Sequence, residues 1–293
     1  MKILITGKGG QLAYELSKTA PEEIKVASYS SLELDITDSD KVLKLITTEK
    51  PDIVINAAAY TAVDQAESDQ KMAFMVNENG TENLALACKK NGSKLIHIST
   101  DFIFSGAKST PYKVTDNAQP VNVYGKSKLA GEQKALDILE SDAIIIRTAW
   151  VYSSFGKNFV KTMLNLMNEK AYLNVVSDQI GTPTWANGLA KFIWSLTSKF
   201  NVNNLHGIFH WTDSGIASWY DFAIAIQELS IEKGLLNKCI PINPIQSANY
   251  PTPAERPKFT VLDKFSTEQQ TGIIGCHWRI QLSKMLDQMK TDM

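Results

Sequence analysis

The sequence is poor in cysteine and histidine, carries almost no net charge and has no long apolar run. Its 293 residues include only Cys88, Cys239 and Cys276, with no CxxC pair, which is typical of a reduced intracellular protein. The four histidines form no cluster with carboxylates at metal-ligand spacing, so no metal site is predicted. Lys plus Arg number 30 against 31 Asp plus Glu, which gives no polybasic surface for nucleic acid or membranes. No apolar stretch reaches spanning length and no signal peptide is evident, so we expect a cytoplasmic location.

Short apolar segments alternate with helical patterns through the first half of the chain. Strands are predicted at residues 3–6, 24–28, 32–36, 53–57, 94–100 and 143–148. Helices are predicted at residues 11–19, 38–50, 72–91 and 127–140, the last continuing a helix that carries Tyr124. This alternation predicts an α/β fold, a Rossmann-type doubly wound parallel sheet covered by helices on both faces.

The alternating pattern weakens after Trp150. Helices are predicted at 158–169, 186–199 and 218–233, and five of the ten prolines lie between Pro241 and Pro257. We expect residues 1–150 to form a dinucleotide-binding domain, to which some later segments return. Residues 151–293 should form mainly a smaller, loop-rich substrate-binding lobe.

A glycine turn follows the first predicted strand and opens a helix, with the pattern Gly7-x-x-Gly10-x-x-Ala13. Glycine allows close backbone approach, and a helix N-terminus offers free N–H groups to a pyrophosphate, so we predict a nicotinamide dinucleotide here. The second strand ends at residues 27–30 without an acidic or a basic side chain, so the choice between NADH and NADPH stays open. Asp35 is a candidate either for the adenine end of the cofactor or for a helix cap, a role for which Asp38 competes.

Two further segments lie at the end of the fourth predicted strand and just beyond it. The small side chains of Ala57, Ala58 and Ala59 end a predicted strand, where they leave room for a dinucleotide or serve tight packing. Residues 64–67 read as the solvated start of a helix.

Tyr124 and Lys128 lie four residues apart on one helix face. A free tyrosine has a pKa of about 10, and a nearby ammonium lowers it toward the range of acid–base catalysis. Thr100 ends the fifth predicted strand, where its hydroxyl can polarise a carbonyl or cap a turn. The company of Tyr124 and Lys128 favours the catalytic interpretation.

Nine motifs distributed along the chain carry a resemblance to a known family. The chain resembles the extended short-chain dehydrogenase/reductases, and within them the dTDP-4-dehydrorhamnose reductases. The motifs are GKGGQLAYEL from Gly7, INAAAYTAVDQAE from Ile55, HISTDFIFSG from His97, PVNVYGKSKLAGE from Pro120, RTAWVY from Arg147, NFVKTML from Asn158, VSDQIGTPT from Val176, SWYDFA from Ser218 and YPTPAERP from Tyr250.

The resemblance implies a role for each matching residue. The catalytic set is Thr100, Tyr124 and Lys128, of which Tyr124 and Lys128 also contact the cofactor. The other implied cofactor contacts are Gly7, Gly10, Gln11 and Leu12 at the pyrophosphate, Asp35 and Ile36 at the adenine, and Ala57, Ala58 and Ala59 along the cofactor path. The implied substrate contacts are Val63, Thr100, Asp101, Phe102, Trp150, Asn158 and, near the diphosphate, Arg256. Phe102 departs from the tyrosine that is frequent in the family.

The resemblance also implies the reaction, which is reduction of the 4-keto group of dTDP-4-dehydro-L-rhamnose to dTDP-L-rhamnose by NADPH or NADH. The product is a donor for cell-surface polysaccharides. Some family members form magnesium-bridged homodimers, but residues 286–289 give no ligand set to carry over. Two alternatives stay open. One is another sugar-nucleotide epimerase, dehydratase or 4-ketoreductase of the same extended family, and the second is a non-catalytic subunit like the regulatory subunit of methionine adenosyltransferase. The intact Thr100, Tyr124 and Lys128 set argues against the second.

Overall fold

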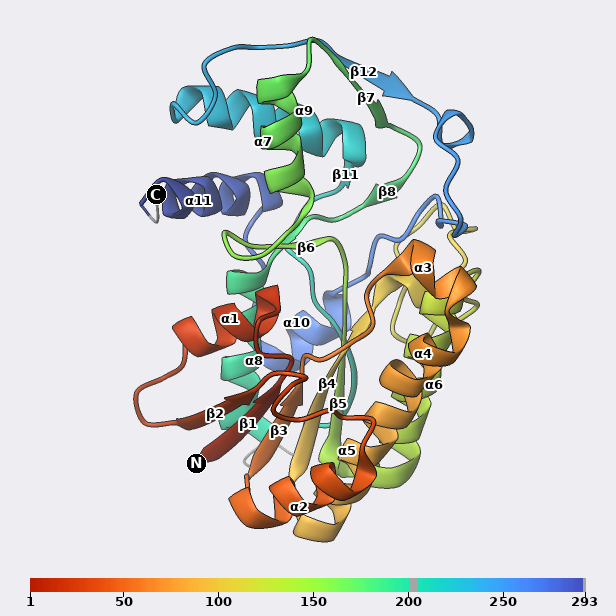
Figure 1. The fold of residues 1–293 in the computed structure, drawn as a ribbon, viewed down its shortest axis with the longest axis vertical. Helices are drawn as coiled ribbons and strands as arrows, with labels where there is room; N and C mark the ends of the chain where they lie inside the picture. The colour runs from red at the N-terminus through yellow and green to blue at the C-terminus, as the bar shows by residue number, and fades with distance from the viewer. Residues whose placement is uncertain (201–204, 292–293) are drawn as a thin grey trace.

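Six parallel strands form the centre of the fold in the computed structural model, which describes residues 1–200 and 205–291 (Figure 1). Their order in the sheet is β10-β5-β4-β3-β1-β2. The strands are β1 (Lys2–Thr6), β2 (Lys25–Tyr29), β3 (Ile53–Asn56), β4 (Lys94–Thr100), β5 (Ala143–Thr148) and β10 (Gly207–His210). The chain leaves β1 first toward β2 and then toward β3, so the order reverses beside β1. In open α/β sheets, ligands bind at such a reversal, outside the carboxyl ends of the strands.

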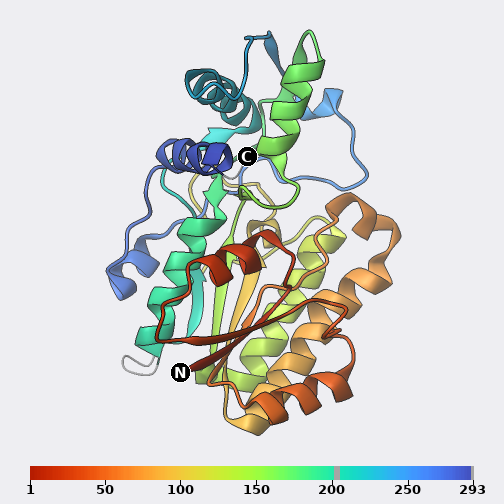
Figure 2. The ribbon, with the colours of Figure 1, turned by 60° about the vertical axis from the view of Figure 1, so that its left-hand side comes forward.

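Helices cover both faces of this sheet (Figure 2). The helices α1 (Gln11–Lys18) and α8 (Ala186–Phe200) pack on one face, and α2 (Ser39–Glu49), α5 (Gly80–Asn91) and α6 (Val123–Leu139) pack on the other. The apolar run of β1 is unbroken because both of its faces are covered. Ile3 and Ile5 face α1 and α8, and Leu4 faces α2, α5 and α6. Alternate side chains of a strand point to opposite faces, so a sheet covered twice needs apolar residues at every position.

The predicted strand at residues 32–36 is wrong. The segment is an irregular connection between β2 and α2, and its backbone groups are bonded locally: the N–H of Glu33 and that of Leu34 both donate to the carbonyl of Ser30. Leu34 and Ile36 are nevertheless buried in the layer formed by α2 and α5. The alternating apolar pattern therefore reflects a loop pressed onto helices rather than a strand in the sheet.

The predicted helix over residues 72–91 is interrupted by a π-helical turn. The segments are α4 (Gln70–Phe74), the π-helix η1 (Met75–Asn79) and α5, and α3 (Val63–Ser68) precedes them. Asn77 in the π-turn exchanges two hydrogen bonds with the backbone of Tyr60 and donates a third to the Ser127 hydroxyl on α6. Turns of this kind are frequent at functional sites, and this one joins the loop after β3 to α6.

A smaller lobe is built mainly from residues after 150 (Figure 1). Its core is aromatic and aliphatic. The rings of Phe222 and Trp278 meet edge to face there, with their centroids 5.8 Å apart. The helices are α7 (Phe159–Glu169), α9 (Trp219–Glu232) and α11 (Trp278–Thr291). The strand pairs are β6 (Val151–Tyr152) with β9 (Thr184–Trp185), β7 (Leu173–Val176) with β12 (Ile242–Ile245), and β8 (Ile180–Gly181) with β11 (Ala217–Ser218). The remaining short helices within the described residues are η2 (Asp101–Ile103), η3 (Glu140–Asp142), η4 (Ser247–Asn249) and α10 (Phe265–Thr271).

Parts of the second half lie in the sheet region. The strand β10 is the edge strand beside β5, and α8 packs against α1. The division into 1–150 and 151–293 stays a prediction, and residues 201–204 and 292–293 of the second part lie outside the described residues. Within the described ranges, no helix combines the length and the apolar character that a membrane crossing requires.

Close contact between α6 and the π-turn yields a first prediction. A Cβ atom on Gly131 would lie 2.1 Å from the carbonyl oxygen of Asn77, which is backbone and cannot swing away. We expect Gly131→Ala to destabilise the protein by about 1–3 kcal/mol, although alanine is the better helix former. Urea unfolding should show a lower midpoint at an unchanged slope. The matched control is Gln133→Ala at an exposed position of α6. A Gly131→Ala protein as stable as the parent would contradict the packing argument.

Candidate active site

A cavity of about 900 Å³ opens at the carboxyl ends of β1, β3, β4 and β5. It lies at the reversal of strand order beside β1, where the fold places ligands. The predicted residues on its wall are Gly7, Gly10, Gln11, Leu12, Asp35, Ile36, Ala57, Ala58, Ala59, Val63, Thr100, Asp101, Phe102, Tyr124, Lys128 and Trp150. One cavity thus gathers sixteen predicted site residues, whose individual roles stay predictions.

The glycine turn has the geometry that a pyrophosphate site requires. Gly7 has a φ of +80°, and a Cβ atom there would lie 2.7 Å from the carbonyl oxygen of Ala57. Gly10 is the N-cap of α1 and supplies no side chain to occupy the free N–H groups of the first turn. These groups and the positive end of the helix dipole are available to an anion. The turn and the small side chains at 57–59 therefore fit a dinucleotide.

The edge of the cavity near β2 separates the two interpretations of Asp35. Asp38 is the N-cap of α2 and accepts from the backbone N–H of Lys41 at 3.0 Å. Asp35 accepts from the backbone and hydroxyl of Thr37, and it lies on the cavity wall with Ile36. The cap of α2 is therefore Asp38, which leaves Asp35 at the position expected of an adenine contact.

Lys128 is almost fully buried on α6, 2% exposed, and its Nζ donates to the carbonyl of Ile98 at 2.7 Å. Burial lowers the pKa of Lys128 to about 8, and Glu132 one turn further along opposes the shift. Glu132 accepts from the Ser99 hydroxyl and pairs with the buried Arg147 at 2.7 Å. The lysine therefore sits at the boundary between its charged and neutral forms near neutral pH.

Tyr124 behaves differently from the prediction. Burial raises its pKa to about 12; the Thr100 side chain opposes this shift and the charge of Asp101 adds to it. The expected lowering by Lys128 is absent: the lysine is not among the causes of this pKa shift, and its Nζ donates to the carbonyl of Ile98. A phenol of this kind keeps its proton at neutral pH, which suits a proton donor.

Thr100 combines the two roles weighed for it. Its Oγ1 accepts from the backbone N–H of Phe102 at 3.2 Å, which caps the short helix η2, and donates to Asp101 at 3.1 Å. It also lies on the cavity wall with Tyr124. Capping therefore fixes the hydroxyl at the strand end without removing it from the site.

Trp219 was not among the predicted site residues. It stacks on Trp150 with ring centroids 3.6 Å apart and lines the cavity. Trp150 has a φ of +47°, which is unusual for a bulky residue. A Cβ atom on Gly181 would lie 2.7 Å from the Trp150 ring, so this glycine makes room for the indole. Lys157 is a second cavity residue that was missed. The motifs were the available signal, because Trp219 lies within SWYDFA and Lys157 directly precedes NFVKTML.

Two predicted substrate residues lie outside this cavity. Asn158 is the N-cap of α7, and its Nδ2 donates to the Gln11 side chain at 2.9 Å and to the carbonyl of Ser153. It contacts the glycine turn from the side of the smaller lobe. Its position therefore suits support of the turn better than direct contact with a ligand in the cavity.

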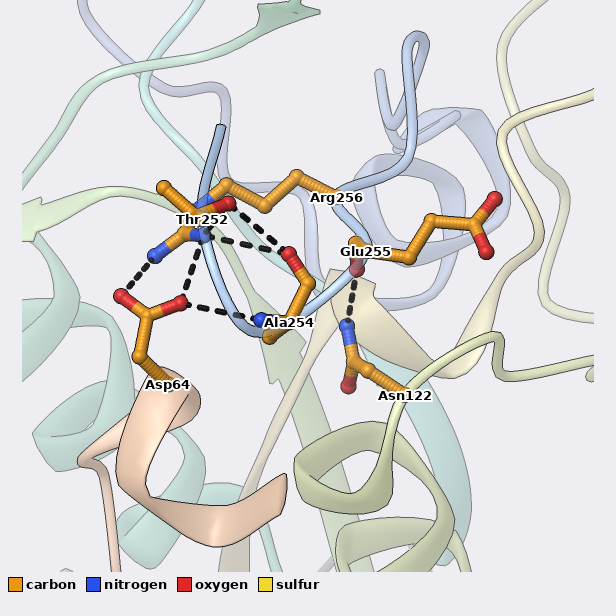
Figure 3. Close-up of polar contacts among 6 residues, drawn as sticks. All are labelled: Asp64, Asn122, Thr252, Ala254, Glu255 and Arg256. Carbon is orange, nitrogen blue, oxygen red and sulfur yellow. Dashed lines mark hydrogen bonds and ion pairs between the residues drawn. The ribbon is translucent and has the colours of Figure 1, made fainter. Parts of the chain in front are cut away.

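Arg256 forms a two-pronged ion pair with Asp64, with N–O distances of 2.9 and 2.8 Å (Figure 3). It also donates to the hydroxyl of Thr252, and Asn122 at the start of α6 donates to the carbonyl of Glu255. The predicted solvated helix start at residues 64–67 is confirmed, because α3 begins at Val63 and the Asp64 side chain is 41% exposed. What the prediction lacked is the partner of Asp64, which binds the loop of residues 252–256. Arg256 faces a second cavity, of about 440 Å³, that includes Lys258 and Gln179.

Metal-binding residues do not come together in the structure. Across residues 1–200 and 205–291, no three histidine, cysteine, aspartate or glutamate side chains form a group that could hold a metal ion. The acidic side chain at 287 instead pairs with Lys233.

The buried carboxyl of Asp101 generates a second prediction. Burial raises its pKa to about 6, against an ordinary value of 3.8, while the hydroxyls of Thr260 and Thr100 oppose the shift. The unfolded chain therefore releases this proton first, and the folded state loses roughly 2–3 kcal/mol as pH rises from about 4 to about 6. Asp101→Asn should remove this loss, so the variant gains stability relative to the parent over this range. Urea unfolding at pH 4 and pH 7 measures the difference; an equal pH dependence in both proteins would refute it.

Comparisons with known proteins agree with this site. A family model described as the RmlD substrate binding domain matches residues 1–291. The chain is 42% identical to the dTDP-4-dehydrorhamnose reductase of Aggregatibacter actinomycetemcomitans, over 97% of this chain and 98% of that relative. A crystal structure of a dTDP-4-dehydrorhamnose reductase from Clostridium acetobutylicum is 39% identical, with a TM-score of 0.93, and covers 99% of this chain and 100% of its own.

A second solved relative carries a cofactor. The crystal structure of the dTDP-4-dehydrorhamnose reductase from Bacillus anthracis in complex with NADP is 33% identical, with a TM-score of 0.91 over 98% of this chain and 99% of that one. Family model, relatives and solved structures agree over nearly the full length. The chain belongs to the family described as the RmlD substrate binding domain, together with these dTDP-4-dehydrorhamnose reductases.

Proposed function

We propose that the protein reduces the 4-keto group of dTDP-4-dehydro-L-rhamnose with NADPH or NADH to give dTDP-L-rhamnose, a donor for cell-surface polysaccharides. The observation that carries the proposal is the meeting of Thr100, Tyr124 and Lys128 beside the glycine turn on one cavity wall. The names of the full-length relatives support the same substrate.

The side chains of this cavity can carry out the proton chemistry of such a reduction. The reduced nicotinamide, when bound, supplies the hydride. Thr100 turns its single hydroxyl proton from Asp101 to the carbonyl oxygen of the sugar and polarises it. Tyr124 gives its proton to the same oxygen as negative charge develops there, and burial keeps that proton in place until then.

The cofactor is held by residues of the sheet region. The N–H groups at the start of α1 bind the pyrophosphate, and Asp35 and Ile36 border the adenine. Lys128, which lines the cavity together with Tyr124, would hold the ribose next to the nicotinamide. NADPH has support from the Bacillus anthracis relative, whose structure holds NADP.

The sugar nucleotide is held by residues nearer the smaller lobe. The stacked rings of Trp150 and Trp219 form an apolar wall for the hexose. The rings of Phe102 and Tyr124 meet edge to face, with their centroids 5.6 Å apart. Phe102 stands where a tyrosine is frequent in the family, so its contact with the substrate is purely apolar. Arg256 and the second cavity suit the nucleoside diphosphate, because the N–H groups of the guanidinium that are not bonded to Asp64 and the loop of residues 252–256 can donate to phosphate oxygens.

The direct test is oxidation of NADPH by the purified protein in the presence of dTDP-4-dehydro-L-rhamnose generated in situ. Parallel reactions use NADH in place of NADPH, and EDTA to remove divalent metals. Formation of dTDP-L-rhamnose in step with NADPH consumption would support substrate and reaction together. Absence of oxidation with dinucleotide still bound would refute the substrate and redirect the search to another keto sugar or to a regulatory role.

Substitution of Tyr124 tests its role as proton donor. Tyr124→Phe keeps the ring and its packing but removes the hydroxyl, so kcat should fall by about 10²–10⁴-fold. Dinucleotide affinity, measured by calorimetry, should stay within a factor of a few. Tyr172→Phe, at a residue 58% exposed, is the matched control and should leave kcat unchanged. Full turnover by Tyr124→Phe would exclude the assigned role.

The Asp64–Arg256 pair separates two roles for Arg256. If the guanidinium contacts the diphosphate, Arg256→Leu should raise KM for the dTDP-sugar about tenfold or more, which is the loss of one charge-assisted contact. Asp64→Asn keeps Arg256 and only weakens the loop contact, so its KM should rise by a smaller factor. Equal KM values for the two variants would show that Arg256 acts only by holding the loop of residues 252–256.

A further inference from the structure

A line of buried polar side chains runs behind the catalytic lysine. Thr6, Asn56 and His97 stand side by side on β1, β3 and β4, and each is at most 1% exposed. The Thr6 hydroxyl donates to Asn56 Oδ1 at 2.7 Å, Asn56 Nδ2 lies 3.0 Å from His97 Nδ1, and His97 Nε2 lies 3.4 Å from Lys128 Nζ. The strands β1 and β3 thus end in a polar chain that continues through His97, in the middle of β4, to the active-site lysine.

The surroundings of Asn56 fix the orientation of its amide. Its Oδ1 accepts from the backbone N–H of Ala58 at 3.2 Å as well as from Thr6. Its Nδ2 faces Thr81 Oγ1 at 3.4 Å, and that hydroxyl gives its own proton to the carbonyl of Asn77 at 2.8 Å. Exchange of the amide oxygen and nitrogen would set a donor against the Ala58 N–H, so the amide presents a donor to His97.

This orientation decides which nitrogen of His97 carries the proton. His97 is completely buried, and burial, followed by the charge of Lys128, holds the pKa of His97 well below its ordinary value. In a neutral imidazole one nitrogen donates and the other accepts. Since Nδ1 must accept from Asn56, the proton lies on Nε2, which faces Lys128.

We propose that His97 is a positioning residue that is locked by Asn56 in the Nε2–H tautomer and thereby favours the neutral amine of Lys128 when no ligand is bound. An ammonium has only donors and cannot accept from Nε2–H, whereas a neutral amine accepts through its lone pair. The same amine still donates to the carbonyl of Ile98 at 2.7 Å. The lysine is thereby held in place with its proton weakly bound.

The other ionisable groups around Lys128 do not cancel this effect. Glu132 favours the ammonium, but its carboxylate is shared with Arg147 through three contacts of 2.7–3.1 Å. The charge of Asp101 acts on Tyr124. The groups that face the lysine or its partners from the packed elements are His97 on β4, Asp101 on η2, Tyr124 and Glu132 on α6, and Arg147 on β5.

The tautomer lock, by which Asn56 keeps the proton of His97 on Nε2, has a consequence for the reaction. This consequence rests on the proposed function. A role of Lys128 in binding the ribose and supporting Tyr124 needs the ammonium. The pH at which Lys128 loses its proton then sets the alkaline limit of activity, because the phenol of Tyr124 releases its proton only at higher pH. Reversal of the His97 tautomer would supply an acceptor for the ammonium and move this limit upward.

The tautomer can be read directly by NMR on protein labelled with ¹⁵N-histidine, without cofactor or substrate. The spectrum should show His97 neutral with the proton on Nε2 between pH 6 and pH 8, and His97→Gln assigns its signal among the four histidines. A proton on Nδ1, or an imidazolium in this range, would overturn the proposal. This spectrum decides the tautomer even if no other variant folds.

Asn56→Asp is the designed reversal. A carboxylate of the same shape still accepts from Ala58 and Thr6, but it also accepts from His97 and should transfer the proton to Nδ1. We expect the alkaline limb of kcat/KM to move up by roughly one pH unit. Asn91→Asp adds the same charge at the far end of α5, beside Ser93, and should change neither readout.

The NMR tautomer of His97 and the alkaline limb of kcat/KM together distinguish the ways in which the proposal can fail. An unchanged His97 tautomer in folded Asn56→Asp protein contradicts the lock itself. A reversed tautomer with an unmoved alkaline limb contradicts its control of Lys128. Absence of any reductase activity, with the Nε2–H tautomer present, would refute the proposed function while the lock stands.

Discussion

The site depends on how closely α6 approaches the strand ends. A Cβ atom on Gly125 would lie 2.2 Å from the carbonyl oxygen of Phe102, and one on Gly131 would lie 2.1 Å from that of Asn77. Both glycines belong to the same short motif as Tyr124 and Lys128. The helix can therefore lie against η2 and the π-turn, and this contact brings the phenol and the amine to the carboxyl end of β4.

Burial then shifts the pKa values of Tyr124 and Lys128 in opposite directions. Loss of hydration penalises the charged form of each group, so the phenol of Tyr124 holds its proton more firmly and the ammonium of Lys128 holds its proton less firmly. A raised pKa suits Tyr124 as a proton donor, because the phenol stays protonated until negative charge develops on the substrate oxygen. A weak proton on Lys128 makes its charge sensitive to neighbours, which is why the buried contacts with His97 and Glu132 matter.

Local patterns in the sequence predicted most of the sheet, the glycine turn and the Tyr124–Lys128 pair, because each depends on spacing within one element. Patterns failed where contacts between distant segments decide. The alternation of apolar residues at 32–36 could not distinguish a strand from a buried loop. No pattern around Asp64 indicates that it pairs with Arg256, which lies 192 residues away in the sequence. The π-turn at Asn77 and the stacking of Trp219 on Trp150 likewise arise only when separate elements pack.

The most direct test of the central claim follows the hydrogen that is transferred. Reduction of dTDP-4-dehydro-L-rhamnose with NADPH that carries two deuterium atoms at C4 of the nicotinamide should place deuterium at C4 of the product hexose, whichever face is used, as seen by mass spectrometry and NMR. A cavity that holds both molecules together, with Tyr124 supplying the proton, predicts deuterium at that carbon in each turnover. A product without deuterium, or deuterated cofactor that persists unchanged through turnover as in an epimerase, would contradict the account.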